Sequence, residues 1–422
     1  MARSSWWFLL TVVVAFPARA GTPLTLDEAL RLAQARYPTV RGAALTEQAT
    51  QHGLAAARSA RWPALGISGG YLHTSPNAQG NPSFVANNAP DEYRAQIGIT
   101  QPLYSGGALG AAISKAEADR EAARADAQVA ARQLGWQVTS QFFGVLKARD
   151  TLRLNELARV AAEAHLREGQ VLLRHGALSR LDATRNQLDV SNAQLDVERA
   201  SGDLTVATRQ LAESIGGPVP SSLATPDVTR GSRLSLDEAI ARTAARPEVA
   251  SARAKARSAE ADWQITQSAL RPQVQAVAGA GWDAATFYSP SNAGWDAGLN
   301  VSVPLFDWGR LAAQARSSEL TYRRATEDIR LAELTVRTEV VQAYTDRDVA
   351  ERQAQTAAES LSLAQQAATM AQTGYRMGSI SNLEFELTRQ QLSVAQRRLA
   401  SARMDAMLAA LRLRWALGEA LP

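Results

Sequence analysis

The stretch LLRHGALSRLDATRNQLD, Leu172–Asp189, places a glycine between two segments of strong helical character. A second stretch of the same design, TGYRMGSISNLEFELTRQ, spans Thr373–Gln390. In both, a serine follows the glycine three residues later, and an acidic residue follows the serine after three more. A glycine is typical of the end of one helix, and Ser-x-x-Asp/Glu is typical of the start of the next. Each stretch therefore predicts a tight turn between two helices.

The two turns belong to two long internal repeats, and repetition of this kind decides an architecture. LTLDEALRLAQARYPTV, from Leu24, matches LSLDEAIARTAARPEVA, from Leu234, and ITQPLYSGG further along matches VSVPLFDWG. A segment rich in Pro, Gly and Ser separates the repeats and is expected to be irregular. We expect one intertwined domain with these parts: a signal peptide at 1–20, a first structural repeat at 21–217, a linker at 218–233 and a second structural repeat at 234–422.

Each repeat is predicted to contain the same elements in the same order. A short helix opens with an S/T-x-x-E capping box at Thr25 or Ser235, and Pro38 or Pro247 begins a second helix. Two β segments follow, then a very long helix, the glycine turn and a last helix. At ~1.5 Å per residue the long helix of the first repeat, residues 108–175, would measure roughly 100 Å. A helix of this length needs a packing partner along its whole course.

The last helix of each repeat carries an apolar seam, which is typical of coiled-coil packing. Its positions alternate by three and four residues, and many are alanine, which allows helix axes to approach closely. A rod of helices in a soluble protein would show the same seam. The positions are Val190, Ala193, Val197, Ala200, Leu204, Ala207, Leu211 and Leu392, Ala395, Leu399, Ala402, Ala406, Ala409, Leu413.

One β segment of each repeat alternates apolar and polar residues: YRAQIGITQPL at 93–103 and WDAGLNVSVPL at 295–305. With aromatic residues near both ends, this pattern favours membrane barrel strands, which have a lipid face and a lumen face. A half-buried sheet in a soluble protein is the alternative. Four strands per chain cannot close a barrel, and an open edge cannot lie in lipid. We therefore expect several chains to share one barrel.

The N-terminus predicts export. Arg3 precedes an apolar run from Trp6 to Phe16, and Ala18-Arg19-Ala20 fits a cleavage site, as in a secretory signal peptide. The chain has no cysteine, so disulfides, thiolate metal sites and an N-terminal lipid anchor at Gly21 are not expected. The net charge of +4 comes from arginines mixed with acidic residues, which argues against nucleic acid binding.

The chain resembles the TolC-type outer-membrane efflux protein family. The resemblance rests on the two L-[TS]-L-D-E-A openings, the P-L-[YF] strand exits at Pro102 and Pro304, and the turns at Gly176 and Gly378. It implies a fold that is mostly α with a small membrane β part, in a trimeric duct of barrel strands and coiled-coil helices. It also implies a passive channel in the outer membrane of a Gram-negative bacterium. Such channels are the exit ducts of tripartite efflux pumps and type I secretion, and they work with a periplasmic adaptor and an inner-membrane transporter.

The same resemblance suggests which residues carry function. It implies that an adaptor docks at the two turns, at His175, Gly176, Ala177, Leu178, Ser179 and at Met377, Gly378, Ser379, Ile380, Ser381. It implies a gate in which Asp182 and Tyr375 match a bonding network between neighbouring turns and Glu384 matches an acidic ring. The sequence departs from the family pattern where Ile380 replaces an arginine and Leu387 replaces a second acid. All of these residues also have an ordinary structural interpretation as helix ends.

Other functions have little support in the sequence. Four histidines are present, none in a metal-ligand spacing, and the glycines form no phosphate-binding loop. We expect no enzyme activity, no metal and no cofactor. A recurrence of aspartates at 182, 189, 196 and 203 is compatible with a tunnel lining or with a solvated outer face. The alternative function is a periplasmic coiled-coil adaptor or scaffold protein.

Overall fold

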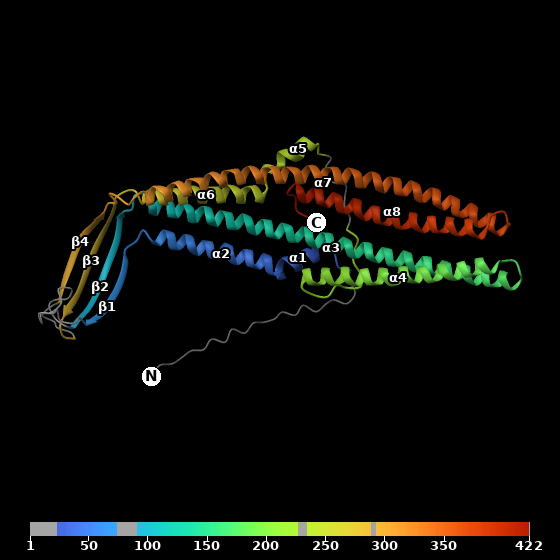
Figure 1. Cartoon of the computed structure of the whole chain (residues 1–422), viewed down its shortest axis with the longest axis horizontal. Helices are drawn as coiled ribbons and strands as arrows, with labels where there is room; N and C mark the ends of the chain where they lie inside the picture. The colour runs from blue at the N-terminus through green and yellow to red at the C-terminus, as the bar shows by residue number, and fades with distance from the viewer. Residues whose placement is uncertain (1–22, 74–90, 227–233, 288–292, 422) are drawn as a thin grey trace. The chain divides into compact units, whose positions relative to one another are not determined.

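A computed structural model of the chain describes residues 23–73, 91–226, 234–287 and 293–421, which are mainly helical (Figure 1). The predicted signal peptide lies outside these residues. The first repeat contains α1 (Leu26–Arg36), α2 (Pro38–Ser59), β1 (Ala64–His73), β2 (Asp91–Tyr104), α3 (Ala108–Arg174) and α4 (Arg180–Ile215). The second contains α5 (Leu236–Ala241), the 3₁₀ helix η1 (Arg242–Ala245), α6 (Pro247–Ser268), β3 (Gln273–Ala284), β4 (Ala293–Ser302), α7 (Arg310–Arg376) and α8 (Asn382–Ala416).

The predicted order of elements is confirmed in both repeats. The helices α2 and α6 each have 22 residues and begin at a proline, whose fixed φ suits the first helical turn. The long helices α3 and α7 each have 67 residues. The opening helices differ, since α1 has 11 residues whereas α5 has 6 and continues as a 3₁₀ turn. None of the helices in the described ranges is long and apolar enough to span a membrane.

The described residues form two compact units. One consists of residues 23–33 and 138–226 and holds α4 with the second part of α3. There the side-chain amide of Asn155 on α3 donates to the carbonyl oxygen of Asp196 on α4 at 3.1 Å. The other unit consists of residues 34–137 and 234–421 and holds the four strands, α2, α6 and the hairpin of α7 and α8. Each unit therefore contains one long helical hairpin.

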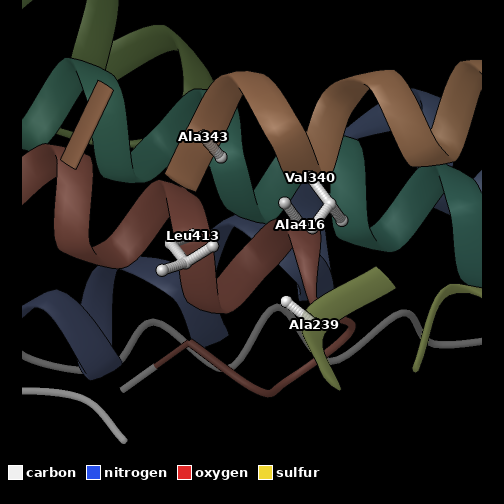
Figure 2. Close-up of a cluster of buried hydrophobic side chains, with 5 residues drawn as sticks. All are labelled: Ala239, Val340, Ala343, Leu413 and Ala416. Carbon is white, nitrogen blue, oxygen red and sulfur yellow. The ribbon is translucent and has the colours of Figure 1, made fainter. Parts of the chain in front are cut away.

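The apolar seams predicted on the last helices are confirmed. All fourteen seam positions on α4 and α8 are buried or half-buried. Figure 2 shows where the seam of α8 ends: Leu413 and Ala416 meet Val340 and Ala343 of α7 and Ala239 of α5. Small alanine side chains at this point let the three helices approach closely.

The strands form one antiparallel sheet in the order β1-β2-β3-β4. Successive side chains of a strand point to opposite faces. On β2 the face with Ile97 and Ile99 is apolar, and both side chains are exposed, whereas Arg94, Gln96 and Thr100 occupy the other face. Every residue of β1 and of β4 is exposed, and within the described residues each of these strands pairs on one side only. The predicted alternation is confirmed, and the sheet has two open edges.

A buried arginine joins the helices of the second unit where α8 ends. The Arg246 side chain is 1% exposed, donates to Glu248 at 2.6 and 2.9 Å and to the carbonyl oxygen of Ala416 at 2.8 Å, and forms an ion pair with Glu339 at 3.0 Å. Its guanidinium lies 5.2 Å from the ring centroid of Trp415. Burial favours the neutral Glu248 carboxyl, but the hydrogen bonds and charge of Arg246 outweigh this effect and hold the pKa of Glu248 below its ordinary value.

Arg246→Met should lower the free energy of unfolding by about 3–5 kcal/mol, because it leaves the carboxylates of Glu248 and Glu339 without their shared partner. Urea unfolding of the purified protein in detergent measures the change. The matched control is Arg412→Met, which breaks an exposed pair with Asp346 and should cost no more than about 1 kcal/mol. Equal losses in the two variants would contradict a special role of the buried pair.

Candidate functional site: the two helical turns and the polar face of the sheet

The first turn joins α3 to α4 and contains the predicted residues His175, Gly176, Ala177, Leu178 and Ser179. Gly176 has a φ of 73°, in the left-handed region that favours glycine. Its N–H donates to the carbonyl of residue 173 at 3.0 Å, and the N–H of Ala177 donates to the carbonyl of residue 172 at 2.8 Å. This pair of bonds is the Schellman motif, which satisfies the last carbonyls of a helix. All five residues except the half-buried Leu178 are exposed.

The second turn joins α7 to α8 and has the same construction. Gly378 has a φ of 72°, its N–H donates to the carbonyl of Tyr375 at 3.0 Å, and the N–H of Ser379 donates to the carbonyl of Gly374 at 2.8 Å. Met377, the last residue before this glycine, is 72% exposed. Ile380 packs over Gly374, where a Cβ atom would lie 3.3 Å from its side chain. The predicted tight turns between helices are thus confirmed, and most of their residues are exposed.

The acidic residue after each turn makes a different bond. At the second turn Glu384 forms the full capping box: its N–H donates to Ser381 Oγ at 3.2 Å, and its carboxylate accepts from the Ser381 N–H at 3.0 Å. At the first turn the N–H of Asp182 donates to Ser179 Oγ at 3.0 Å, but its carboxylate accepts from the Ser179 hydroxyl at 2.6 Å. The reciprocal box predicted there is therefore wrong, because aspartate is one methylene shorter than glutamate.

An aromatic stack supports the second turn and was not predicted. The ring of Tyr375 lies parallel to that of Phe385, with centroids 4.8 Å apart and an angle of 6°. The guanidinium of Arg389 lies 5.8 Å from the Phe385 ring and pairs with Glu386 at 3.0 Å. The sequence contained a signal for this stack, because Tyr375 and Phe385 are aromatic only in the second repeat. The first repeat has leucine and alanine at the corresponding positions. The structure brings Tyr375 and Glu384 to one turn, whereas Asp182 belongs to the other compact unit.

The recurring aspartates of α4 flank the α3–α4 seam. Asp182, Asp189 and Asp196 are half-buried, and Asp203 is exposed. Asp182 also forms an ion pair with Arg185 at 3.5 Å. The first three aspartates therefore do not lie on a fully solvated face of this unit.

The polar face of the sheet carries two bonded groups that sequence reasoning missed. Arg94 of β2 pairs with Glu92 at 2.6 Å and with Asp283 of β3 at 3.0 Å. The amide of Gln96 on β2 donates to Asp296 of β4 at 3.3 Å and crosses the intervening strand β3 at a glycine. Periodicity placed some of these residues on one face, but the bonds depend on the strand register, which a single sequence does not reveal.

The polar groups of the two turns and of the sheet face are joined to one another by hydrogen bonds and ion pairs. In the part of the chain that the structure describes, no group of three His, Asp or Glu side chains could hold a metal ion. The carboxylates of Asp182, Glu384 and Glu386 are engaged in helix capping and ion pairs.

Comparisons with known proteins agree with this geometry. The family model described as "Outer membrane efflux protein" matches residues 29–217 and 239–419. The pyoverdine export outer membrane protein OpmQ of Pseudomonas aeruginosa is 26% identical over 367 residues, which cover 84% of this chain and 76% of that protein. Outer membrane protein TolC of Vibrio cholerae is 25% identical over 407 residues, which cover 93% and 90%. The solved structure of VceC from Vibrio cholerae has a TM-score of 0.82 at 18% identity and covers 93% of this chain and 96% of that one.

Gly378→Ala should lower the free energy of unfolding by about 1–2 kcal/mol, since alanine is disfavoured at a φ of 72°. No atom lies within 4 Å of the added Cβ, so the cost comes from the backbone alone. The control is Gly202→Ala in the interior of α4, also without neighbours, which should stabilise by about 0.5–1 kcal/mol. Urea unfolding compares the two, and a change of the same sign in both would contradict the assigned turn.

Proposed function

This chain belongs to the outer membrane efflux protein family, and we propose that it is the exit duct of a tripartite efflux pump or of a type I secretion system. It is an outer-membrane efflux channel of a Gram-negative bacterium, with the fold of channel proteins rather than of enzymes. In the proposal three copies form one passive channel, a periplasmic adaptor docks on the helical turns, and an inner-membrane transporter supplies the substrate. The observation that carries the proposal is a sheet with open edges and an exposed apolar face, joined to helices of 67 residues.

The sheet supports a barrel shared between copies. Its apolar face exposes Leu65 by 68%, Ile67 by 83% and Leu299 by 68%, which suits contact with outer-membrane lipid. In hydrocarbon each unpaired backbone N–H or C=O costs several kcal/mol, so open edges are not tolerated there. Pairing of β4 with β1 of another copy removes both edges. We therefore infer a homotrimer whose strands close one barrel, with the polar face toward the lumen.

The helices support a tunnel across the periplasm. At ~1.5 Å per residue, α3 and α7 each measure roughly 100 Å. They begin where β2 and β4 end, so they continue the wall away from the membrane. In the proposal they form the wall of the periplasmic duct.

The two turns are proposed as the adaptor docking sites, at His175 to Ser179 and at Met377 to Ser381. A docking tip must hold its shape before the partner arrives, and both turns are closed by Schellman bonds and serine caps. The exposed side chains of Met370, on the last turns of α7, and of Met377, its C-cap, lie seven residues apart and offer an adaptable apolar surface.

The gate is proposed at Asp182, Tyr375 and Glu384. Three Glu384 carboxylates around a narrow axis would favour cations and would repel one another as the ring tightened. Tyr375 is held by its stack on Phe385, which presents the phenol in a defined direction. Where relatives often have an arginine, Ile380 packs over Gly374, and Leu387 is 49% exposed. The closed entrance would therefore depend more on apolar contact than on ion pairs.

The alternative function, a periplasmic adaptor or scaffold, has less support. An adaptor would show one helical hairpin flanked by β-rich domains, whereas this chain has two hairpins and one sheet. The family match also covers both repeats.

The trimer is tested by fractionation of cells that express the full chain. The protein should appear in the outer membrane and run on a denaturing gel as a trimer that heat converts to a monomer slightly smaller than the 45.2 kDa full-length chain, because the predicted signal peptide is removed. A soluble periplasmic monomer would contradict the proposed duct and favour the scaffold.

The gate is tested by ion selectivity of the purified channel in planar bilayers. By Coulomb's law, three carboxylates at about 10 Å from a permeating cation in water attract it by roughly 1 kcal/mol in total. Glu384→Gln should therefore lower the permeability ratio of cations to anions by about 5-fold. Glutamine keeps the capping box with Ser381, so this variant separates charge from helix capping.

Glu384→Ala removes both the charge and the box and should match the glutamine variant in selectivity. The control is Glu386→Gln, which removes an acid already paired with Arg389. Unchanged selectivity in Glu384→Gln would remove Glu384 from the gate.

A further inference from the structure

Trp308 stands in a backbone conformation that tryptophan rarely adopts. Its φ is 58°, and it is the single non-glycine residue with positive φ in the described part of the chain. The side chain is 89% exposed, and its ring lies 4.8 Å from that of Phe306, itself 75% exposed. A bulky residue with positive φ is a genuine outlier. Outliers of this kind persist where the surroundings enforce them and often mark functional sites.

The turn around Trp308 is firmly built. The Asp307 carboxylate accepts from the N–H of Gly309 at 3.1 Å and from the N–H of Leu311 at 2.7 Å, which satisfies the first donors of α7. These bonds hold Trp308 in the left-handed region and turn the indole outward. The chain thus maintains a strained aromatic residue where glycine would fit without strain.

The first repeat has glycine at this place, for a visible reason. Gly106 has a φ of 63°, and a Cβ atom there would lie 2.6 Å from the carbonyl oxygen of Ser268, at the end of α6. Arg271 closes the contact by donating to the Gly106 carbonyl at 2.9 Å. At this junction the start of α3 meets the end of α6 with no room for a side chain.

The repeats show what should face Trp308. Helix α2 corresponds to α6, with the same length, and Ser59 corresponds to Ser268. Strand β2, which leads into α3, pairs with β3, which follows α6. By the same relation, β4, which leads into α7, should pair with a strand that follows a helix like α2. That strand is β1 of another copy, since β1 of the same chain lies at the opposite edge of the sheet.

We propose that Trp308 is a wedge between copies, inserted between the start of α7 and the end of α2 of the partner subunit. The inference rests on the proposed trimer and names a contact within it. By the repeat relation, the Cβ of Trp308 would point as a Cβ on Gly106 would, toward the end of a helix, here that of the partner subunit. The carbonyl of Ser59 of the partner subunit cannot approach as closely as Ser268 approaches Gly106. The gap between α7 and the partner's α2 is therefore wider than the gap between α3 and α6 within a chain, and the indole fills it.

The end of α2 offers suitable chemistry for the indole. Trp62, just after α2, is 73% exposed. At each contact between copies, Trp308 of one copy would therefore meet Trp62 of the partner subunit. Aromatic pairs attract beyond the burial of their area. The competing occupant is lipid, because aromatic residues also gather at membrane interfaces. The test must separate these two.

A photo-reactive benzoylphenylalanine in place of Trp308 keeps an aromatic ring and reports what it touches. In the full chain, irradiated in outer membranes, it should give a covalent dimer on a denaturing gel, with the adduct mapped to residues 54–65 of the partner subunit. Adducts with lipid alone, or within the same chain, would overturn the wedge. The matched control is the same residue at Tyr104, whose neighbours are in its own chain, and an equal dimer yield there would also overturn it.

Assembly is measured separately. The chain has no cysteine, so the substitutions Leu299→Cys and Tyr71→Cys introduce the only two thiols of each copy. The repeat relation makes these two positions neighbours across the β4–β1 edge. A bis-maleimide should join copies through this pair. If that link forms and position 308 labels only lipid, the wedge is wrong and the trimer stands. If neither forms, the proposed trimer itself fails.

Trp308→Gly keeps the left-handed turn, as Gly106 does, and should fold. Because it empties the seam, it should lower the temperature at which the trimer dissociates on a denaturing gel. An unchanged or raised temperature would overturn the wedge.

Discussion

Backbone N–H and C=O groups cannot remain unpaired in hydrocarbon, and the rest of this structure depends on that constraint. The sheet has four strands, an exposed apolar face and two open edges. A chain built in this way is incomplete alone in a membrane. In the proposed trimer, pairing between copies would make it complete and would also decide which helices of neighbouring chains lie side by side. In that proposal the paired strand edges close the barrel, and the long helices extend its wall.

The internal repeat supplies the framework, and the differences between repeats supply the individual features. Both turns share the same glycine geometry and serine cap, but only the second has the full capping box and the stack of Tyr375 on Phe385. Trp308 stands where the first repeat has Gly106. The residue before the second helix is Tyr37 in one repeat and the buried Arg246 in the other. In each case the common position is structural, whereas the departure concerns a contact that the other repeat does not make.

Helix ends connect stability with function in this fold. Helices of 67 residues carry four unsatisfied carbonyls at the end, and each turn satisfies two of them with Schellman bonds of 2.8–3.0 Å. The same bonds fix the backbone of the two turns, which are the proposed docking sites of the adaptor. The end of α8 is satisfied differently: Arg246 donates to the carbonyl of Ala416 and pairs with the carboxylates of Glu248 and Glu339. A change at any of these ends would alter both packing and the surface offered to partners.

From the sequence alone, the element order, the 67-residue helices, both glycine turns, the seams and the two faces of the strands could all be predicted, because each follows from periodicity or from a local backbone requirement. The family also follows, since its motifs occur twice in order. The stack at Tyr375, the Gln96–Asp296 bond across a strand and the Arg246 cluster could not be predicted. They join residues from separate elements, and their geometry depends on strand register and helix rotation. The capping motif at Asp182 could be predicted only in part. The sequence showed the Ser-x-x-Asp motif, but the shorter aspartate side chain bonds the Ser179 hydroxyl and not the Ser179 N–H. Only the folded backbone shows how far this side chain reaches.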